Sequence, residues 1–143
     1  MPRVLYDEDF FLWTQEQAAL LRDKKLTELD LDNLAEEIES LGKCDRRELE
    51  SWLRILMTHL LKWRYQSAER SGSWRGTITE QRLRIQRLLR DSPSLRAQMQ
   101  AFAHSEYPDA RTKALDETGL LMLPETCPFT AAQILETAFW PES

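Results

Sequence analysis

Six side chains between positions 36 and 82 could take part in acid–base, anion-binding or hydrogen-bonding chemistry. They are Glu36, Glu37, His59, Arg64, Trp74 and Arg82. The helical spacing described below places several of them on or beside buried faces, where an unpaired charge costs several kcal/mol. We therefore expect Glu37 to pair with Arg82 or Arg64, while His59 and the Trp74 indole complete the hydrogen bonds.

Such a polar cluster has two interpretations. The simpler is a structural network that fixes the register of the helices, and the alternative is a pocket for a small anion or a metal ion around Glu37, His59 and Arg82. Catalysis is less favoured, because the chain has only two histidines and contains no HExxH motif, paired metal-ligand cysteines or glycine-rich phosphate loop. The sequence predicts no metal and no cofactor, and leaves open whether the protein is an enzyme, with a leaning to no.

The segments that contain these six residues have apolar side chains at helical spacing. The pattern predicts a helix over 7–22 and a second over 30–42, with Asp30 as its cap and Gly42 as its C-terminal stop. The second helix has one apolar face, formed by Leu31, Leu34, Ala35, Ile38 and Leu41.

A third helix is predicted over 45–66, and we expect it to be the central one. From Trp52 to Leu61 it is apolar on nearly all sides, which is typical of a helix surrounded by others. The alternating cations and aromatic rings at 62–65 then mark the point where the helix leaves the core. We expect the stem of Lys62 to cover apolar surface while its ammonium group stays in water.

The rest of the chain predicts a loop and three more helical segments. The loop covers 67–76, and Thr77 with Glu80 then forms a capping box that starts a fourth helix. A fifth helix starts at Pro93 after the cap Ser92, is kinked or restarted at Pro108, and ends at Gly119. A short helix starts at Thr130, where Gln133 completes a second capping box.

Composition supports one soluble, all-α domain over 1–143, an antiparallel bundle of about five to six helices around a central apolar helix. The chain has 143 residues, 42% of them hydrophobic and 30% charged, with only four glycines. Its first ten residues lack the long apolar run of a secretory signal, and no stretch approaches the length of a membrane span, so we expect a cytoplasmic protein. Cys44 and Cys127 are then expected to be reduced thiols.

Charge is distributed unevenly. Residues 1–61 carry a net −6, residues 62–96 a net +6, and residues 97–143 a net −5. We favour helices of opposite charge packing together over a basic surface for an external anion. The basic segment 62–96 leaves nucleic-acid binding as a second alternative, although the overall charge of −5 makes it an unlikely partner.

Several strings, in order along nearly the whole chain, resemble a bacterial family known only as domain of unknown function 29. They are "YDEDFFLWTQEQAALLR", "LDLDNLAEEIESLG", "HLLKWRYQ", "SWRGTITEQR", "DSPSL", "ETGL" and "CPFTAAQIL…FWP". The resemblance implies an all-helical, soluble single domain, and it brings no assigned activity and no catalytic residue.

The function that these observations favour is a non-enzymatic, intracellular interaction module that binds a protein partner or a second copy of itself. An exposed Trp13 or Trp140 beside apolar neighbours would mark such a surface, and the C-terminal stretch "ILETAFW" could pack on its own chain or on another.

Overall fold

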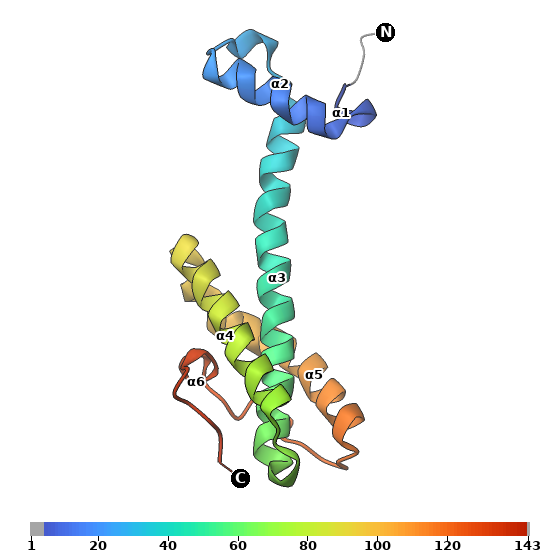
Figure 1. Cartoon of the computed structure of the whole chain (residues 1–143), viewed down its shortest axis with the longest axis vertical. Coiled ribbons are helices and arrows are strands. Elements are labelled where there is room, and N and C mark those ends of the chain that lie inside the picture. Colours follow the sequence, from blue (N-terminus) through green and yellow to red (C-terminus); the bar gives the residue numbers. More distant parts are fainter. Residues whose placement is uncertain (1–4, 143) are drawn as a thin grey trace. The chain divides into compact units, whose positions relative to one another are not determined.

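The computed structural model describes residues 5–142, and every regular element in them is a helix (Figure 1). The all-α prediction is therefore confirmed. The elements in chain order are α1 (Leu5–Glu8), α2 (Phe10–Arg22), η1 (Leu26–Glu28), α3 (Leu31–Tyr65), η2 (Ser67–Glu69), α4 (Gly72–Asp91), η3 (Pro93–Gln98), α5 (Met99–Thr118) and α6 (Ala131–Leu135), where η denotes a 3-10 helix. None of these helices combines the length and the apolar character that crossing a membrane requires.

The chain forms two compact units that divide between Cys44 and Asp45. The single domain expected over 1–143 stays a prediction. Unit 1 consists of the described residues up to Cys44, and unit 2 runs from Asp45 onward. Helix α3 starts in unit 1 and ends in unit 2.

Unit 1 is held together around the indole of Trp13, which is 3% exposed. The indole nitrogen donates a hydrogen bond to Asp30 Oδ2 at 3.0 Å, and the amide of Asn33 donates to the same oxygen at 2.8 Å. The backbone N–H of Asp30 donates to Gln17 Oε1, and the Tyr6 hydroxyl donates to Glu37. Polar contacts thus join α1 and α2 to the start of α3, as α2 crosses that end of the helix in Figure 1.

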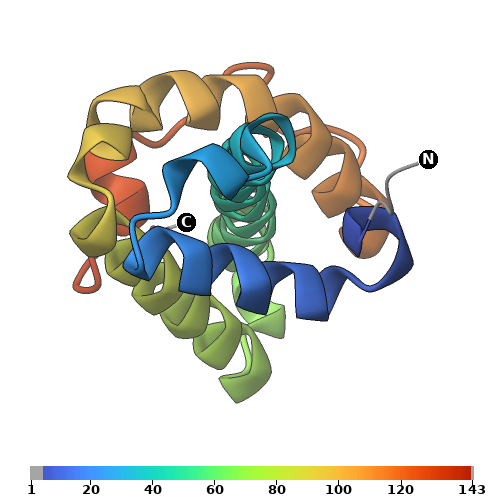
Figure 2. The ribbon, with the colours of Figure 1, turned by 90° about the horizontal axis from the view of Figure 1, so that it is seen from above.

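Unit 2 is built on the C-terminal half of α3, with α4, α5 and α6 around it (Figure 2). Six large apolar side chains of this half are fully buried: Leu49, Leu53, Leu56, Met57, Leu60 and Leu61. They pack in one core with residues such as Ile78 and Ile85 of α4 and Phe102 and Ala110 of α5. The prediction of a central apolar helix is confirmed.

Helix α3 does not stop at Gly42. It continues for 35 residues, so the two helices predicted over 30–42 and 45–66 are one, and the predicted stop was wrong. Glycine permits the left-handed conformation that ends helices, but it adopts the α conformation as well, at a cost of about 1 kcal/mol relative to alanine. Gly42 has no positive φ angle, whereas Gly119 has φ of 72° and ends α5 as predicted.

Two further helix boundaries differ from those predicted. Helix α4 starts at Gly72, because the Ser71 side chain accepts from the backbone N–H of Trp74 and caps the helix there, six residues before the predicted cap Thr77. Helix α5 starts at Met99, because the predicted start at Pro93 opens the 3-10 helix η3 instead, and it runs through Pro108 without restarting. The capping box of Thr130 and Gln133 is confirmed at the start of α6.

Replacing Gly42 by alanine tests the continuity of α3. A Cβ atom added at Gly42 meets no atom within 4 Å, so Gly42→Ala should raise the free energy of unfolding by about 0.5–1 kcal/mol. The matched control is Gly119→Ala, which should lower it by roughly 1–2 kcal/mol because its φ angle is positive. Urea unfolding followed by circular dichroism measures both, and a loss of stability for Gly42→Ala would contradict a continuous helix.

Candidate functional site

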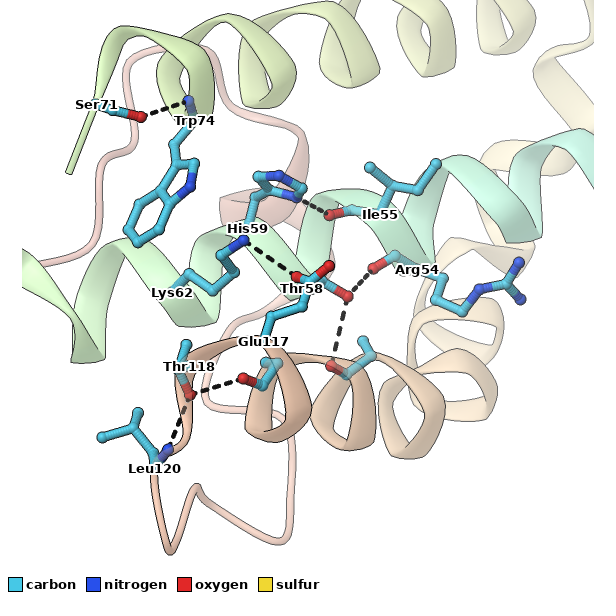
Figure 3. A network of polar contacts seen from close by, with 12 residues as sticks. Arg54, Ile55, Thr58, His59, Lys62, Ser71, Trp74, Glu117, Thr118 and Leu120 are labelled. Atoms are coloured by element: carbon cyan, nitrogen blue, oxygen red, sulfur yellow. Dashed lines mark hydrogen bonds and ion pairs between the residues drawn. The ribbon is translucent and has the colours of Figure 1, made fainter. Parts of the chain in front are cut away.

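Among the six predicted site residues, His59 and Trp74 both lie beside Lys62 in unit 2 (Figure 3). Lys62, in the last turns of α3, is only 9% exposed. Its Nζ donates to Glu117 Oε2 of α5 at 3.1 Å and lies 4.8 Å from the centroid of a ring of Trp74 in α4. This Lys62 network therefore joins three helices through one ammonium group. The expectation that this group stays in water was wrong, because a carboxylate and an aromatic face take the place of water.

His59 is half-buried one turn before Lys62. Its Nδ1–H donates to the carbonyl oxygen of Ile55 at 2.9 Å. Burial is the main reason that the pKa of His59 is lowered from its ordinary value. The positive charges of Lys62 and Lys113 lower the pKa further, while the Ile55 carbonyl and Glu117 oppose them. The imidazole is thus held neutral at pH 7, with one ring nitrogen used in a local backbone hydrogen bond.

The hydroxyl of Ser71, a candidate nucleophile for His59, already has a structural role. Ser71, one of the two serines in the preceding loop, is the cap of α4, and its oxygen accepts from Trp74 N at 3.2 Å. A hollow of about 270 Å³ near the Lys62 network is lined by Gln66, Glu69, Trp74, Glu117 and Thr118. The volume of this hollow is slightly below the usual range for small-molecule sites. In addition, the charge of Lys62 already neutralises Glu117 at its edge.

Arg82 is fully buried, and its partners are main-chain oxygens. Its Nε donates to the carbonyl of Ile134 at 2.8 Å and its Nη2 to that of Gln133 at 3.2 Å. These two carbonyls lie at the C-terminal end of α6, where helix oxygens lack intrahelical partners and carry partial negative charge. The guanidinium also lies 5.5 Å from the centroid of a Trp140 ring. Arg82 thus fixes the C-terminal segment to α4.

The remaining predicted residues have separate surroundings. The guanidinium of Arg64, at the end of α3, lies 5.4 Å from the ring centroid of the adjacent Tyr65. Glu37 belongs to unit 1, where it accepts from Tyr6. That hydrogen bond is the main cause that raises the pKa of Tyr6 to about 12, and burial of the phenol contributes. Glu36, on the same helix, is exposed. The structure thus gives Glu37 and Arg82 different partners from those expected.

No group of three His, Cys, Asp or Glu side chains in residues 5–142 is arranged to hold a metal ion. The buried Lys62 and its partner Glu117, 55 positions away, were missed by the sequence reasoning. Arg70 was also missed: it donates to the carbonyls of Trp63 and Pro141 and ties the C-terminal segment to the end of α3. Helical spacing could have placed Lys62 on the His59 side of α3, but no local pattern identifies a partner that distant in sequence.

The two tryptophans considered as surface markers are not exposed. Trp13 is buried in unit 1, and Trp140 is half-buried, with its ring centroid 4.7 Å from that of Trp63. The C-terminal segment packs on its own chain, because Ile134 is buried and Phe139 and Trp140 contact the core of unit 2. The exposed apolar side chains of this protein lie elsewhere, mostly in unit 1.

Comparison with known protein families identifies a family for this chain. A family model described as "Domain of unknown function DUF29" matches residues 5–140, which confirms the resemblance seen in the sequence. No curated protein and no solved structure matches.

Removing the guanidinium of Arg82 should release the C-terminal segment. Arg82→Ala leaves two buried carbonyls without donors and creates a cavity, so we expect the free energy of unfolding to fall by about 3 kcal/mol. We also expect residues 131–142 to become sensitive to limited proteolysis. The matched control is Arg84→Ala on the same helix, which removes an exposed ion pair with Glu80 and should cost less than about 1 kcal/mol. Equal effects of the two variants would contradict the role of Arg82.

The lowered pKa of His59 should make stability depend on pH. Below its ordinary pKa of 6.5, the unfolded chain binds a proton that the folded chain resists, so the free energy of unfolding falls until the folded pKa is also passed. His59→Gln should therefore lose less stability than the wild type between about pH 8 and pH 5. Urea unfolding at several pH values measures the difference, and identical pH profiles for the two chains would contradict it.

Proposed function

The chain belongs to the DUF29 family, which has no assigned activity, and we propose that it acts as a protein-interaction module with its binding surface in unit 1. The observation that carries this proposal is the number of large apolar side chains that unit 1 leaves in solvent. Eight are exposed: Phe10, Phe11, Leu12, Leu21, Leu26, Leu31, Ile38 and Leu41. By contrast, Trp13 is the one large apolar side chain that the described residues of unit 1 bury completely.

The clearest part of this surface is a stripe on the first turns of α3, which we call the α3 stripe: Leu31, Ile38 and Leu41. These three side chains are 64%, 67% and 69% exposed. The three side chains belong to the apolar face that the three–four spacing of the sequence predicts. Within the structure the stripe has almost no cover, because α1 and α2 contact α3 through Asp30, Asn33 and Glu37 instead.

The energetics favour a partner for this surface. Fully burying a leucine or isoleucine side chain is worth about 1.5–3 kcal/mol. The three side chains of the α3 stripe are about two-thirds exposed, so covering them would contribute about 3–6 kcal/mol in total. Association itself costs an estimated 4 kcal/mol or more, so the α3 stripe alone gives weak binding. Exposed neighbours in unit 1 such as Phe11 and Leu26 would have to add contacts for a stable complex.

The alternative of a catalytic or ligand-binding pocket has less support. Glu37, His59 and Arg82 each have hydrogen-bond partners of their own and do not bind one another. An unpaired reactive group is what an active site needs, whereas unit 1 offers unpaired apolar area, which is what a protein interface needs.

Site-specific photo-crosslinking in the cells that produce the protein tests the proposal. A photoreactive amino acid at Ile38 should give one or a few discrete adducts, because the α3 stripe is in contact with a partner. The matched control carries the same amino acid at Ser40, which is exposed and points away from the stripe, since residues two apart lie on different faces of a helix. Equal, diffuse labelling from both positions would overturn the proposal.

A further inference from the structure

A groove along α4 in unit 2 has the character of a helix-binding site. It consists of two adjoining hollows of about 530 and 580 Å³, which share Glu80 and Leu83. The apolar lining comes from Trp52 and Leu88, which are half-buried, and from Leu83, which is 52% exposed on the surface of a folded helix.

At the N-terminal end of α4 the groove is open, because α4 carries glycines there. Gly72 and Gly76 lie one turn apart and line the second hollow with Arg75 and Thr79. A Cβ atom added at either glycine would meet no other atom within 4 Å. A second helix could therefore approach α4 closely along this face, with Leu83 in contact.

The charges of the groove and of the α3 stripe are complementary. Helix α4 carries five arginines against two acids. The groove is lined by three of the arginines, Arg75, Arg84 and Arg87, and by both acids, Glu80 and Asp91, which leaves its lining a net charge of +1. The segment that carries the α3 stripe has the opposite sign: four acids and no Lys or Arg lie between positions 31 and 41. The apolar centre of each surface is thus bordered by charges that attract the other.

From this complementarity we infer that the α3 stripe docks into the α4 groove of a second copy of the chain. The inference rests on the proposed function and names the partner of the same surface. The mode is an amphipathic helix laid in an apolar groove. Each copy carries both halves of the contact, so two copies that exchange them reciprocally make the contact twice.

Two variants separate the two halves of the contact. Ile38→Asp places a charge in the α3 stripe, and Gly76→Gln fills the groove with a side chain that the helix of the chain itself tolerates. Glutamine is a better helix former than glycine, so Gly76→Gln should not lower the melting temperature. If the melting temperature is unchanged and association is lost, the filled groove and not an unfolded chain is the cause. The control is Leu121→Asp, at a fully exposed leucine outside the groove and the stripe.

Sedimentation velocity of the full chain over a concentration series is the measurement. We expect a dimer for the wild type and for Leu121→Asp. Each of the two contact variants should be mainly monomeric, with a dissociation constant raised about tenfold or more. An equimolar mixture of Ile38→Asp and Gly76→Gln should recover a complex of one copy of each, because one intact stripe then meets one intact groove.

Three results would overturn the inference. They are a monomeric wild type, a Gly76→Gln variant that still forms the wild-type dimer, and a mixture of the two variants that forms no complex. The crosslinking experiment separates these failures from failure of the proposed function. An adduct of Ile38 with a different protein keeps the interaction module and excludes the second copy, whereas the absence of any adduct removes both.

Discussion

The burial of the C-terminal half of α3 is the constraint on which unit 2 depends. Once Leu53, Leu56 and Leu60 are enclosed by α4, α5 and α6, every polar group on the same turns must find a partner inside the protein. Thr58 donates to the carbonyl of Arg54, and Lys62 pairs with Glu117. The polar network is thus a consequence of the apolar core, and it fixes how α4 and α5 meet the central helix.

The same helix has a different environment at its other end. In unit 1 the contacts that hold α1 and α2 to α3 are polar, through Trp13, Asp30 and Glu37, and they use one side of the helix. The apolar side that begins with Leu31 stays exposed. Unit 1 is small and buries too little apolar surface to be strongly stable by itself. A protein that covers its exposed apolar side chains would therefore stabilise unit 1 by binding to it.

Sequence reasoning succeeded where the deciding interaction is local. The capping box at Thr130 and the left-handed end at Gly119 depend on neighbouring residues, and the buried run from Leu53 to Leu61 follows from its own periodicity. It failed where the deciding partner is distant. Spacing placed Arg82 on a buried face correctly, but nothing near position 82 identifies main-chain oxygens 51 and 52 residues later as its acceptors. Spacing also found the α3 stripe without deciding whether a partner covers it.

The hydrogen-bond partners of the buried polar side chains limit the functions that these side chains can perform. A catalytic group must keep hydrogen-bonding or proton-transfer capacity for a substrate. Three chemically capable side chains use much of this capacity inside the protein, although Nη1 of Arg82 is buried without a hydrogen-bond partner. His59 donates to a backbone carbonyl, Lys62 neutralises Glu117, and Arg82 completes the end of α6. The described residues also leave apolar area exposed in unit 1, and a groove with an apolar lining bordered by arginines and two acids on α4. Surfaces of that kind lower their free energy by contact with another protein surface, and this is the reason that we propose association as the function.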